Sequence, residues 1–332
     1  MIWFWLGFFA FVAILLALDL GVLHRKQVEP TLRSSAYWTA AWMALGLAFT
    51  GFVYLMYEHH WLGAKLVEPS KSPGTDASIM FVSAYLLEYA LSVDNIFVIS
   101  LLFHSFRVPS KYQHRVLFWG ILGAIVFRLT MLGGGAWLAA KFTWIFYVFG
   151  AYLAYQGFKL LRPEDEDEAS HDKSLAVRTL RKFVRVVDGD HGGRFMVRID
   201  GRRALTTVAV CLVSIELTDI VFALDSIPAV LSVSQDIFIM VTSNIFAIMG
   251  LRSLYFVLAG AMDKFKYLKI ALAILLMVIG AKMALHEHVH VPHVVSLALI
   301  AGIIGIGVLA SVISSRRDEK AAAADAPIAP DA

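Results

Sequence analysis

The sequence predicts an all-α protein that crosses a membrane several times. Of its 332 residues 59% are hydrophobic, and the mean hydropathy of +0.70 is well above that of a soluble domain. The hydrophobic residues gather in runs of about 20, the length that crosses a bilayer as a helix. Five carboxylates nevertheless lie inside these runs, where an ionisable side chain is costly and marks a candidate functional site. Together these observations indicate a helical membrane protein with an acidic site between its helices.

Nine helices are expected to span the membrane. No basic residue precedes the apolar run from Ile2 to Leu23, so this run is expected to be a first span and not a cleaved signal peptide. The one cysteine, Cys211, lies inside a predicted span, which leaves neither a disulfide framework nor a cysteine-based metal site. The expected spans are residues 2–23, 36–57, 77–103, 115–135, 144–161, 204–231, 236–261, 266–285 and 293–313.

Lysine and arginine residues are distributed unevenly over the connecting segments. With the N-terminus outside, 22 of them fall on the cytosolic side, against three (Lys65, Lys71 and Lys141) on the outer side. Cytosolic loops of membrane proteins carry such an excess of positive charge. The sequence therefore predicts a multi-pass protein of a bacterial-type inner membrane, with the N-terminus outside and the C-terminus in the cytosol.

Two groups of three spans resemble each other. Glu88 and Asp94 are six residues apart, as are Asp219 and Asp225. The series continues in order, because Arg128 matches Arg252, Lys141 and Phe142 match Lys264 and Phe265, and Gly157 and Lys159 match Gly280 and Lys282. Since each group has three spans, the second group must enter the membrane from the opposite side. The sequence thus predicts an inverted repeat of three plus three helices, an architecture typical of secondary transporters.

The repeat divides the chain into six segments. These are a two-helix segment at 1–57, the first repeat at 77–161, a cytosolic loop at 162–203, the second repeat at 204–285, a final helix at 286–315 and a tail at 316–332. The Ala, Pro and Asp content of the tail predicts disorder.

The cytosolic loop contains two recognisable patterns. Its acidic run, residues 164–168, is interpreted as a solvated linker in preference to a metal sensor. Farther on, Phe195, Val197 and Ile199 occupy alternate positions just before an Asp-Gly pair, which predicts a short β-hairpin. Cytosolic or membrane proteins that bind this loop are expected partners, besides the lipid bilayer itself, and nothing in the sequence indicates nucleic-acid binding.

The intramembrane charges do not balance. Five acids face two arginines, so about three negative charges are left uncompensated if all of the acids are ionised, which a low dielectric does not tolerate without protons or a cation. The available ligands are oxygens, which suit a hard ion such as Mn, Mg or Ca. The candidate metal ligands are Glu88, Asp94, Asn95, Glu216, Asp219, Asp225, Ser226 and Asn244, with Arg128 and Arg252 as supporting charges. The alternative interpretation is that the arginines pair with acids only to hold helices together.

Helical geometry separates the candidates. At 100° per residue Glu88, Ser92 and Asn95 share one face of a straight helix, whereas Asp94 lies about 120° away. In the second repeat Pro228 removes a backbone hydrogen bond and is expected to kink or unwind the helix beside Asp225, which would free carbonyls for a cation.

Several long motifs resemble the TerC/Alx family of integral membrane proteins. They are EYALSVDNIF (88–97), YQHRVLFWGILGAIVFR (112–128), HGGRFMVR (191–198), ELTDIVFALDSIPAV (216–230) and TSNIFAIMGLRSLYF (242–256). Tyr89 departs from the family pattern, in which many members carry lysine after the glutamate. The resemblance implies a lysine-exporter-like transporter with manganese(II) export as its activity, and tellurite resistance as the historical name of the family.

Three classes of function compete on these grounds. A secondary transporter that exports Mn(II) or a similar divalent cation accounts for the repeat, the charge surplus and the resemblance together. A non-transporting stress-response or tellurite-resistance scaffold is the alternative, and it leaves the buried acids without a role. An enzyme is not expected, because no nucleophile and base pair or nucleotide loop occurs. No resident cofactor is expected either.

Histidines on the expected outer side form a further candidate metal site. Imidazoles at such density bind zinc or nickel, but their spacing matches no standard site. They are His59, His60, His286, His288, His290 and His293.

Overall fold

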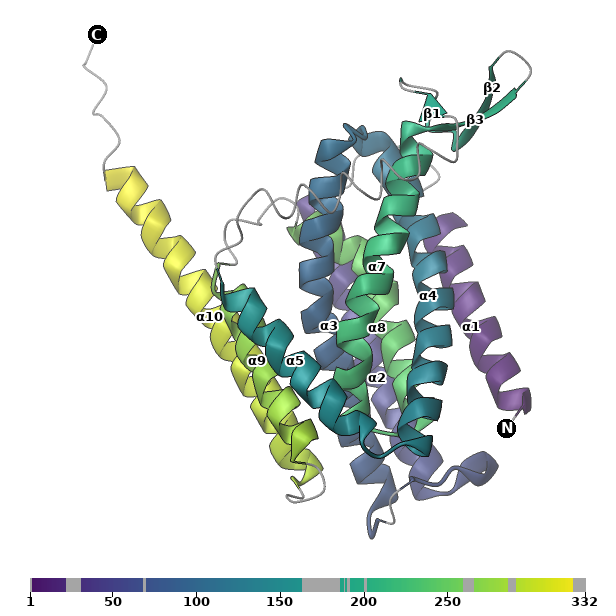
Figure 1. Ribbon diagram of the computed structural model, residues 1–332, viewed down its shortest axis with the longest axis vertical. Helices are drawn as coiled ribbons and strands as arrows, with labels where there is room; N and C mark the ends of the chain where they lie inside the picture. The colour runs from purple at the N-terminus through teal and green to yellow at the C-terminus, as the bar shows by residue number, and fades with distance from the viewer. Residues whose placement is uncertain are drawn as a thin grey trace.

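The computed structural model describes residues 2–21, 31–67, 70–162, 186–187, 189, 192–199, 202–258, 266–285 and 291–324. Within these ranges, nine α-helices form a bundle with a small β-sheet at one end, termed the sheet end (Figure 1). The helices are α1 (Ile2–Gly21), α2 (Leu32–Glu58), α3 (Pro73–Ser105), α4 (Ser110–Lys141), α5 (Ile145–Leu161), α7 (Thr207–Leu231), α8 (Ile237–Leu258), α9 (Lys266–Ala284) and α10 (His293–Ala324), with one 3-10 turn, η1 (Trp61–Gly63).

Most of the helices in the described ranges have the length and apolar character of membrane spans. Seven of them qualify, namely α2, α3, α4, α7, α8, α9 and α10. Helix α1 has a shorter apolar segment, Phe4–Leu18, and α5 has 17 residues. The predicted all-α, multi-pass membrane architecture is therefore confirmed, with helix ends within two turns of the expected ones except for the longer α10. The number of crossings stays a prediction.

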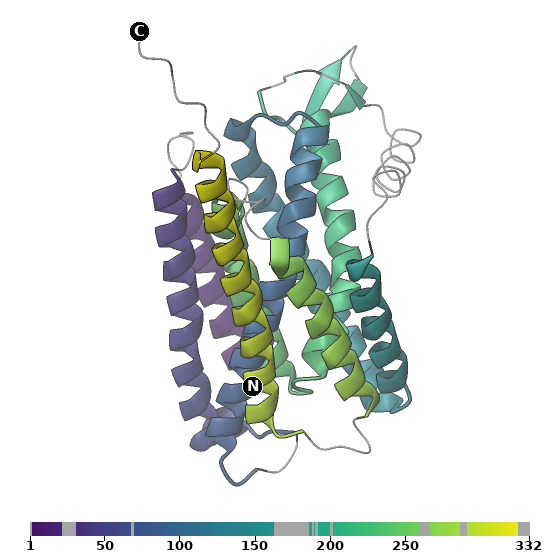
Figure 2. The same ribbon diagram turned by 90° about the vertical axis from the view of Figure 1, so that its left-hand side faces the viewer.

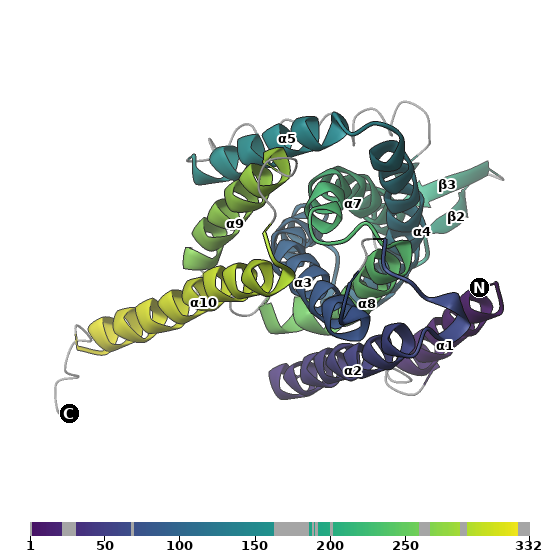
Figure 3. The same cartoon turned by 90° about the horizontal axis from the view of Figure 1, so that it is seen from below.

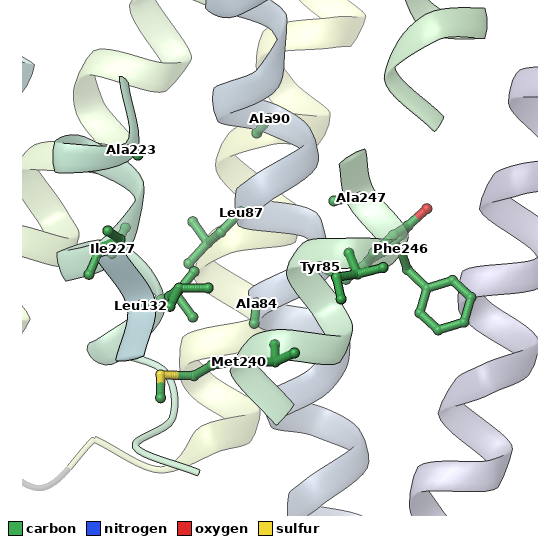
Figure 4. Packing of buried hydrophobic residues seen from close by; sticks show 14 of the residues in the cluster. Ala84, Tyr85, Leu87, Ala90, Leu132, Ala223, Ile227, Met240, Phe246 and Ala247 are labelled. Atoms are coloured by element: carbon green, nitrogen blue, oxygen red, sulfur yellow. The ribbon is translucent and has the colours of Figure 1, made fainter. Parts of the chain in front are cut away.

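Helix α8 forms the centre of the bundle. The most apolar part of α8 is 83% buried inside the protein, and the helix packs against α2, α3 and α4. Figure 3 shows α3, α4, α7 and α8 clustered together, with α1 and α2 along one side and α5, α9 and α10 along the other. Side chains from all four central helices meet in the core, among them Leu87, Leu132, Ile227 and Met240 (Figure 4). Close van der Waals packing of this kind holds helices together in lipid.

Helix ends coincide with capping residues. Thr31 Oγ1 accepts the Ser34 N–H at the start of α2, and Thr206 Oγ1 accepts the Ala209 N–H at the start of α7, each at 3.3 Å. These bonds satisfy backbone donors that have no partner inside the helix. Pro73 occupies the first turn of α3, where its missing N–H costs nothing.

Helix α8 begins at a buried acid. Asp236 Oδ1 accepts the N–H groups of Phe238 at 2.9 Å and Ile239 at 3.3 Å. Burial raises the pKa of the Asp236 carboxyl, although a hydrogen bond from Tyr57 on α2 and the two backbone donors oppose the rise. Asp236 thus ties the start of α8 to the end of α2.

The two three-helix groups run in opposite directions, as an inverted repeat requires. Helix α3 runs toward the sheet end, whereas α7 starts there and runs away from it, and α5 and α9 are likewise antiparallel (Figures 1 and 2). Helices α5 and α9 cross at glycines. A Cβ atom added to Gly150 would lie 2.7 Å from the Gly280 carbonyl oxygen, and one added to Gly280 would lie 2.6 Å from the Gly150 carbonyl oxygen. The absence of side chains at both positions lets the two backbones approach closely.

A three-stranded sheet precedes α7. Strand β2 (Met196–Ile199) pairs with β3 (Arg202–Thr206) in antiparallel register, Ile199 opposite Arg202, which confirms the predicted hairpin. Strand β1 (Val186–Val187) adds to the other edge of β3 in parallel, which the sequence did not indicate. The segment just before β2 contacts α4, where Arg115 Nη1 donates to the Gly193 carbonyl oxygen at 3.2 Å and the Arg115 guanidinium covers the Phe195 ring.

Two expectations were wrong. Helix α7 does not unwind at Pro228 but stays α-helical to Leu231, because the proline lies in the last turns and the ladder resumes with the Ser232 N–H donating to the Pro228 carbonyl at 3.0 Å. The tail expected to be disordered from residue 316 begins instead as a continuation of α10 to Ala324. Its last four residues are alanines, which have the highest helix propensity.

Some sequence-based expectations lie outside the described residues. These are the acidic run at 164–168, the tail at 325–332, the match of Lys264 and Phe265 to the first repeat, and the histidines at 286, 288 and 290.

Candidate functional site

Arg128 connects three helices in the middle of the bundle. It lies on α4, and its side chain is 2% exposed. Its Nη1 donates to Glu88 Oε2 on α3 at 2.5 Å, and its Nη2 and Nε donate to Asp219 Oδ1 and Oδ2 on α7 at 3.0 and 3.2 Å. The two-pronged bond to Asp219 is a strong arrangement for a guanidinium and a carboxylate. Glu88, Arg128 and Asp219 are termed the Arg128 triad.

The two acids of the triad are equivalent residues of the two repeats. The Glu88 side chain is fully buried, and that of Asp219 is 13% exposed. Glu88, Ser92 and Asn95 are all buried on α3, as expected from the prediction that they share one face of the helix. The Ser92 hydroxyl donates to the Glu88 backbone carbonyl at 2.6 Å. Two carboxylates and one guanidinium leave one negative charge when all three are ionised.

Two buried amides border the triad. Asn95 Nδ2 donates to Asp219 Oδ1 at 3.4 Å, and the Asn244 side chain on α8 adjoins Glu88. By distance and angle, Asn95 Oδ1, Glu88 Oε1 and both polar side-chain atoms of Asn244 make no hydrogen bond within the described part of the chain, although the Asn244 amide interacts with the Glu88 carboxylate. An acceptor left without a donor in a dry interior is costly, so these oxygens are ready to bind a cation or a proton.

Glu216 lies one turn before Asp219 on α7. Its half-buried carboxylate interacts electrostatically with Asp219, and Oε2 has no donor among the described residues. The carboxylate lies directly over Gly123 of α4, where an added Cβ atom would collide with it. Gly123 therefore makes the space that admits a third acid beside the Arg128 triad.

Asp225 lies in a separate cluster on the other side of α7. Gln156 Nε2 of α5 donates to Asp225 Oδ1 at 2.9 Å, and the hydroxyl of Tyr152 also hydrogen-bonds this carboxylate. Neither of these α5 residues is among the candidates predicted from the sequence. A glutamine inside a predicted span was the available signal, because amides are rare at that depth.

The remaining candidates are placed individually. Asp94 is half-buried on α3, Ser226 is 2% exposed on α7, and Arg252 is 3% exposed on α8. The Ser226 hydroxyl has no hydrogen-bond partner in the described ranges. The structure thus brings together Glu88, Asn95, Arg128, Glu216, Asp219 and Asn244, termed the central cluster. Asp225 hydrogen-bonds instead to Gln156 of α5.

The central cluster is not a preformed metal centre. Over the described residues, no three His, Cys, Asp or Glu side chains converge closely enough to hold a metal ion. Arg128 occupies three of the four carboxylate oxygens of Glu88 and Asp219. A cation that entered the cluster would have to use the oxygens that Arg128 leaves open, or displace it.

Comparison with known proteins identifies the family. The model of the integral membrane protein TerC family matches residues 74–319, which contain every residue of the central cluster. An uncharacterized membrane protein of Myxococcus xanthus is 42% identical over 97% of this chain and 96% of its own length. The protein Alx of Escherichia coli (strain K12), named as a membrane-bound redox modulator, is 40% identical over 90% of this chain and 91% of its own length. No solved structure matches the chain. The chain belongs to the TerC family of integral membrane proteins.

Proposed function

We propose that the protein is a secondary transporter that exports a divalent metal cation, with Mn(II) as its principal substrate. Resemblance to the TerC/Alx family supplies the choice of Mn(II), since oxygen ligands alone suit Mg and Ca equally well. The proposed path passes through the central cluster. The proposed orientation places the sheet end in the cytosol of a bacterial-type cell, in agreement with the excess of Lys and Arg there.

One observation carries the proposal: the central cluster combines oxygens that lack hydrogen-bond donors with a negative charge that Arg128 does not fully compensate. Four acceptors lack donors within the described residues, namely Glu88 Oε1, Asn95 Oδ1, Glu216 Oε2 and Asn244 Oδ1. Three carboxylates (Glu88, Glu216 and Asp219) and one guanidinium (Arg128) sum to a charge of minus two when ionised. One divalent cation neutralises this charge and supplies the missing partner for the oxygens.

Arg128 is proposed to help the central cluster release the transported cation. In the described arrangement the guanidinium pairs with both Glu88 and Asp219 and so competes with a cation for the same oxygens. Binding that is too tight would trap the ion, whereas transport requires both entry and exit. The sequence contains no nucleotide-binding motif, so export draws on an ion gradient or runs downhill.

The redox role in the name of the Escherichia coli relative finds less support in this chain. Cys211 is the single cysteine and is fully buried in α7, so the chain cannot form a dithiol pair of its own. The buried acids, by contrast, have a direct use in cation transport.

Metal content of cells tests the proposal. Cells without their own manganese exporter receive the wild type, Asp219→Asn or the control Glu58→Gln, and intracellular Mn is measured under Mn load together with the amount of membrane-inserted protein. Glu58 is exposed at the end of α2, and glutamine keeps its acceptor for the Gly74 N–H. Wild type and Glu58→Gln are expected to lower intracellular Mn, and Asp219→Asn to leave it high. Equal Mn with and without abundant wild-type protein would favour the scaffold alternative instead.

A further inference from the structure

A polar stripe on α5 faces Asp225, away from the central cluster. Gln156 Nε2 donates to Asp225 Oδ1 at 2.9 Å and to the Tyr152 hydroxyl at 2.7 Å. The Tyr152 hydroxyl also hydrogen-bonds Asp225, and the Lys159 ammonium acts on the same carboxylate electrostatically. Tyr152, Gln156 and Lys159 are spaced by four and three residues, which puts them on one face of the helix. This face is termed the α5 stripe.

Packing alone does not require the α5 stripe. In the register that aligns Gly157 with Gly280 and Lys159 with Lys282, the second repeat carries Leu275 where the first has Tyr152, and Ile279 where it has Gln156. Helix α9 therefore spans the same kind of environment with apolar side chains. An amide inside a membrane is expensive unless it is satisfied, and such residues are functional by default.

The α5 stripe crosses an interface that is suited to movement. Helix α5 packs most closely on α9, with Gly150 against Gly280, and only lightly on α4 and α7 (Figure 3). The hydrogen bonds from Gln156 and Tyr152 to Asp225 therefore join α5 to α7 across a sparsely packed boundary. A polar contact of this kind can open without breaking a tight core.

We propose that Gln156 and Tyr152 are positioning residues that occupy Asp225 until the transported divalent cation displaces their N–H and O–H donors. This inference rests on the proposed cation transport, and it adds the residues that set the apparent affinity of the transporter for the cation. A carboxylate that already accepts two donors is stabilised before the cation arrives. The cation must break those hydrogen bonds to bind Asp225. The α5 stripe therefore weakens cation binding at Asp225 and eases release of the cation from it.

Removing the donor should therefore lower the cation concentration that gives half-maximal transport. Gln156→Ile inserts the residue that the second repeat has at this position. A hydrogen bond to a charged group corresponds to about a tenfold change in an equilibrium constant, so the half-maximal Mn(II) concentration is expected to fall about five- to tenfold. Tyr152→Phe deletes one hydroxyl and should shift the same quantity in the same direction by a smaller factor.

Initial rates of Mn(II) entry into proteoliposomes, measured over a range of Mn(II) concentrations, test this expectation. Tyr155→Phe is the matched control for both variants, because Tyr155 lies on the same helix and is 62% exposed. The control should keep the half-maximal concentration of the wild type. A purely structural role of the α5 stripe would lower the maximal rate or the protein yield without moving that concentration.

Each outcome decides a separate question. If the wild type moves no Mn(II), the proposed function fails. If the wild type transports but Gln156→Ile keeps the wild-type half-maximal concentration, only the role of the α5 stripe fails. A higher half-maximal concentration in Gln156→Ile would make Gln156 a ligand of the cation and would overturn the displacement proposal.

Discussion

Asp94 and Asp225 lie on opposite sides of the Arg128 triad, displaced along two antiparallel helices. Each follows its triad acid by six residues, Glu88 on α3 and Asp219 on α7. At 1.5 Å per residue this spacing is about 9 Å along each helix axis. Because α3 runs toward the sheet end and α7 away from it, Asp94 lies nearer the sheet end and Asp225 nearer the opposite end (Figure 1). Along the bundle axis the acids therefore form a line of successive heights with Arg128 in the middle, while Asp225 faces α5 and not the central cluster.

This line predicts opposite accessibility for the two ends. Val98→Cys, one helical turn after Asp94, and Ser226→Cys, beside Asp225, are introduced separately into a Cys211→Ser background. Val98→Cys is expected to react with membrane-impermeant thiol reagents from the cytosol, and Ser226→Cys from outside, with Mn(II) changing both rates. The measurement is the labelled fraction over time in right-side-out and inside-out vesicles. Labelling of both positions from one side would contradict the path drawn through the repeat.

Arg128 is expected to stabilise the fold as well as the site. Arg128→Leu leaves Glu88 and Asp219 buried without their cation, and breaking a buried ion pair from one side costs about 3–5 kcal/mol. The temperature at which half of the detergent-solubilised protein is lost from its size-exclusion peak should fall strongly. Combining Arg128→Leu with Glu88→Gln and Asp219→Asn removes the unpaired charges and should recover most of this loss. Arg128→Leu with wild-type stability would show that the triad contributes little to folding.

Gly123 is expected to be intolerant of a side chain. Gly123→Ala puts a methyl group into the Glu216 carboxylate, so either the acid or α4 must move, and overpacking of this kind costs about 1–3 kcal/mol. Gly133→Ala on the same helix is the control, because an added Cβ atom there meets no atom within 4 Å. Mn(II) transport and thermal stability should fall for Gly123→Ala and stay unchanged or improve slightly for Gly133→Ala. Equal transport and stability of the two variants would contradict the close packing of the Glu216 carboxylate against Gly123.

Asp236 is expected to make stability depend on pH. Its folded-state pKa is raised by burial, so the native protein binds this proton more tightly than the unfolded chain. The resulting stabilisation is complete below the unfolded pKa of about 3.9 and is lost as pH rises through the folded pKa. Asp236→Asn keeps the acceptor for the Phe238 and Ile239 N–H groups but carries no charge. Its melting temperature should exceed that of the wild type at neutral pH, with a gap that narrows on acidification; a constant gap would contradict the argument.

The sequence predicts the helices and the buried acids because both depend on local patterns. Runs of apolar residues set the spans, and the cost of a charge in lipid singles out Glu88 and Asp219. The ordered matches between the two groups of spans likewise indicate the antiparallel arrangement of α3 and α7.

Other features depend on how the helices pack and were not predictable from the chain. The simultaneous pairing of Arg128 with Glu88 and Asp219 follows from the packing of α7 against both α3 and α4, which brings the Arg128 side chain within reach of both acids. The partnership of Gln156 with Asp225 follows from the side of α7 that α5 covers. Pro228 shows the limit of a local rule, because the proline alone predicts a break, whereas α7 stays helical to Leu231 with the proline in its last turns.

Transport by purified protein tests the central claim most directly. Wild type and Asp219→Asn, each confirmed as folded by size-exclusion chromatography, are reconstituted in liposomes that contain a Mn(II)-sensitive dye, and the initial rate of Mn(II) entry is recorded. The account predicts saturable entry with the wild type and entry no faster than in protein-free liposomes with Asp219→Asn. Equal entry rates for the wild type, the variant and protein-free liposomes would contradict it.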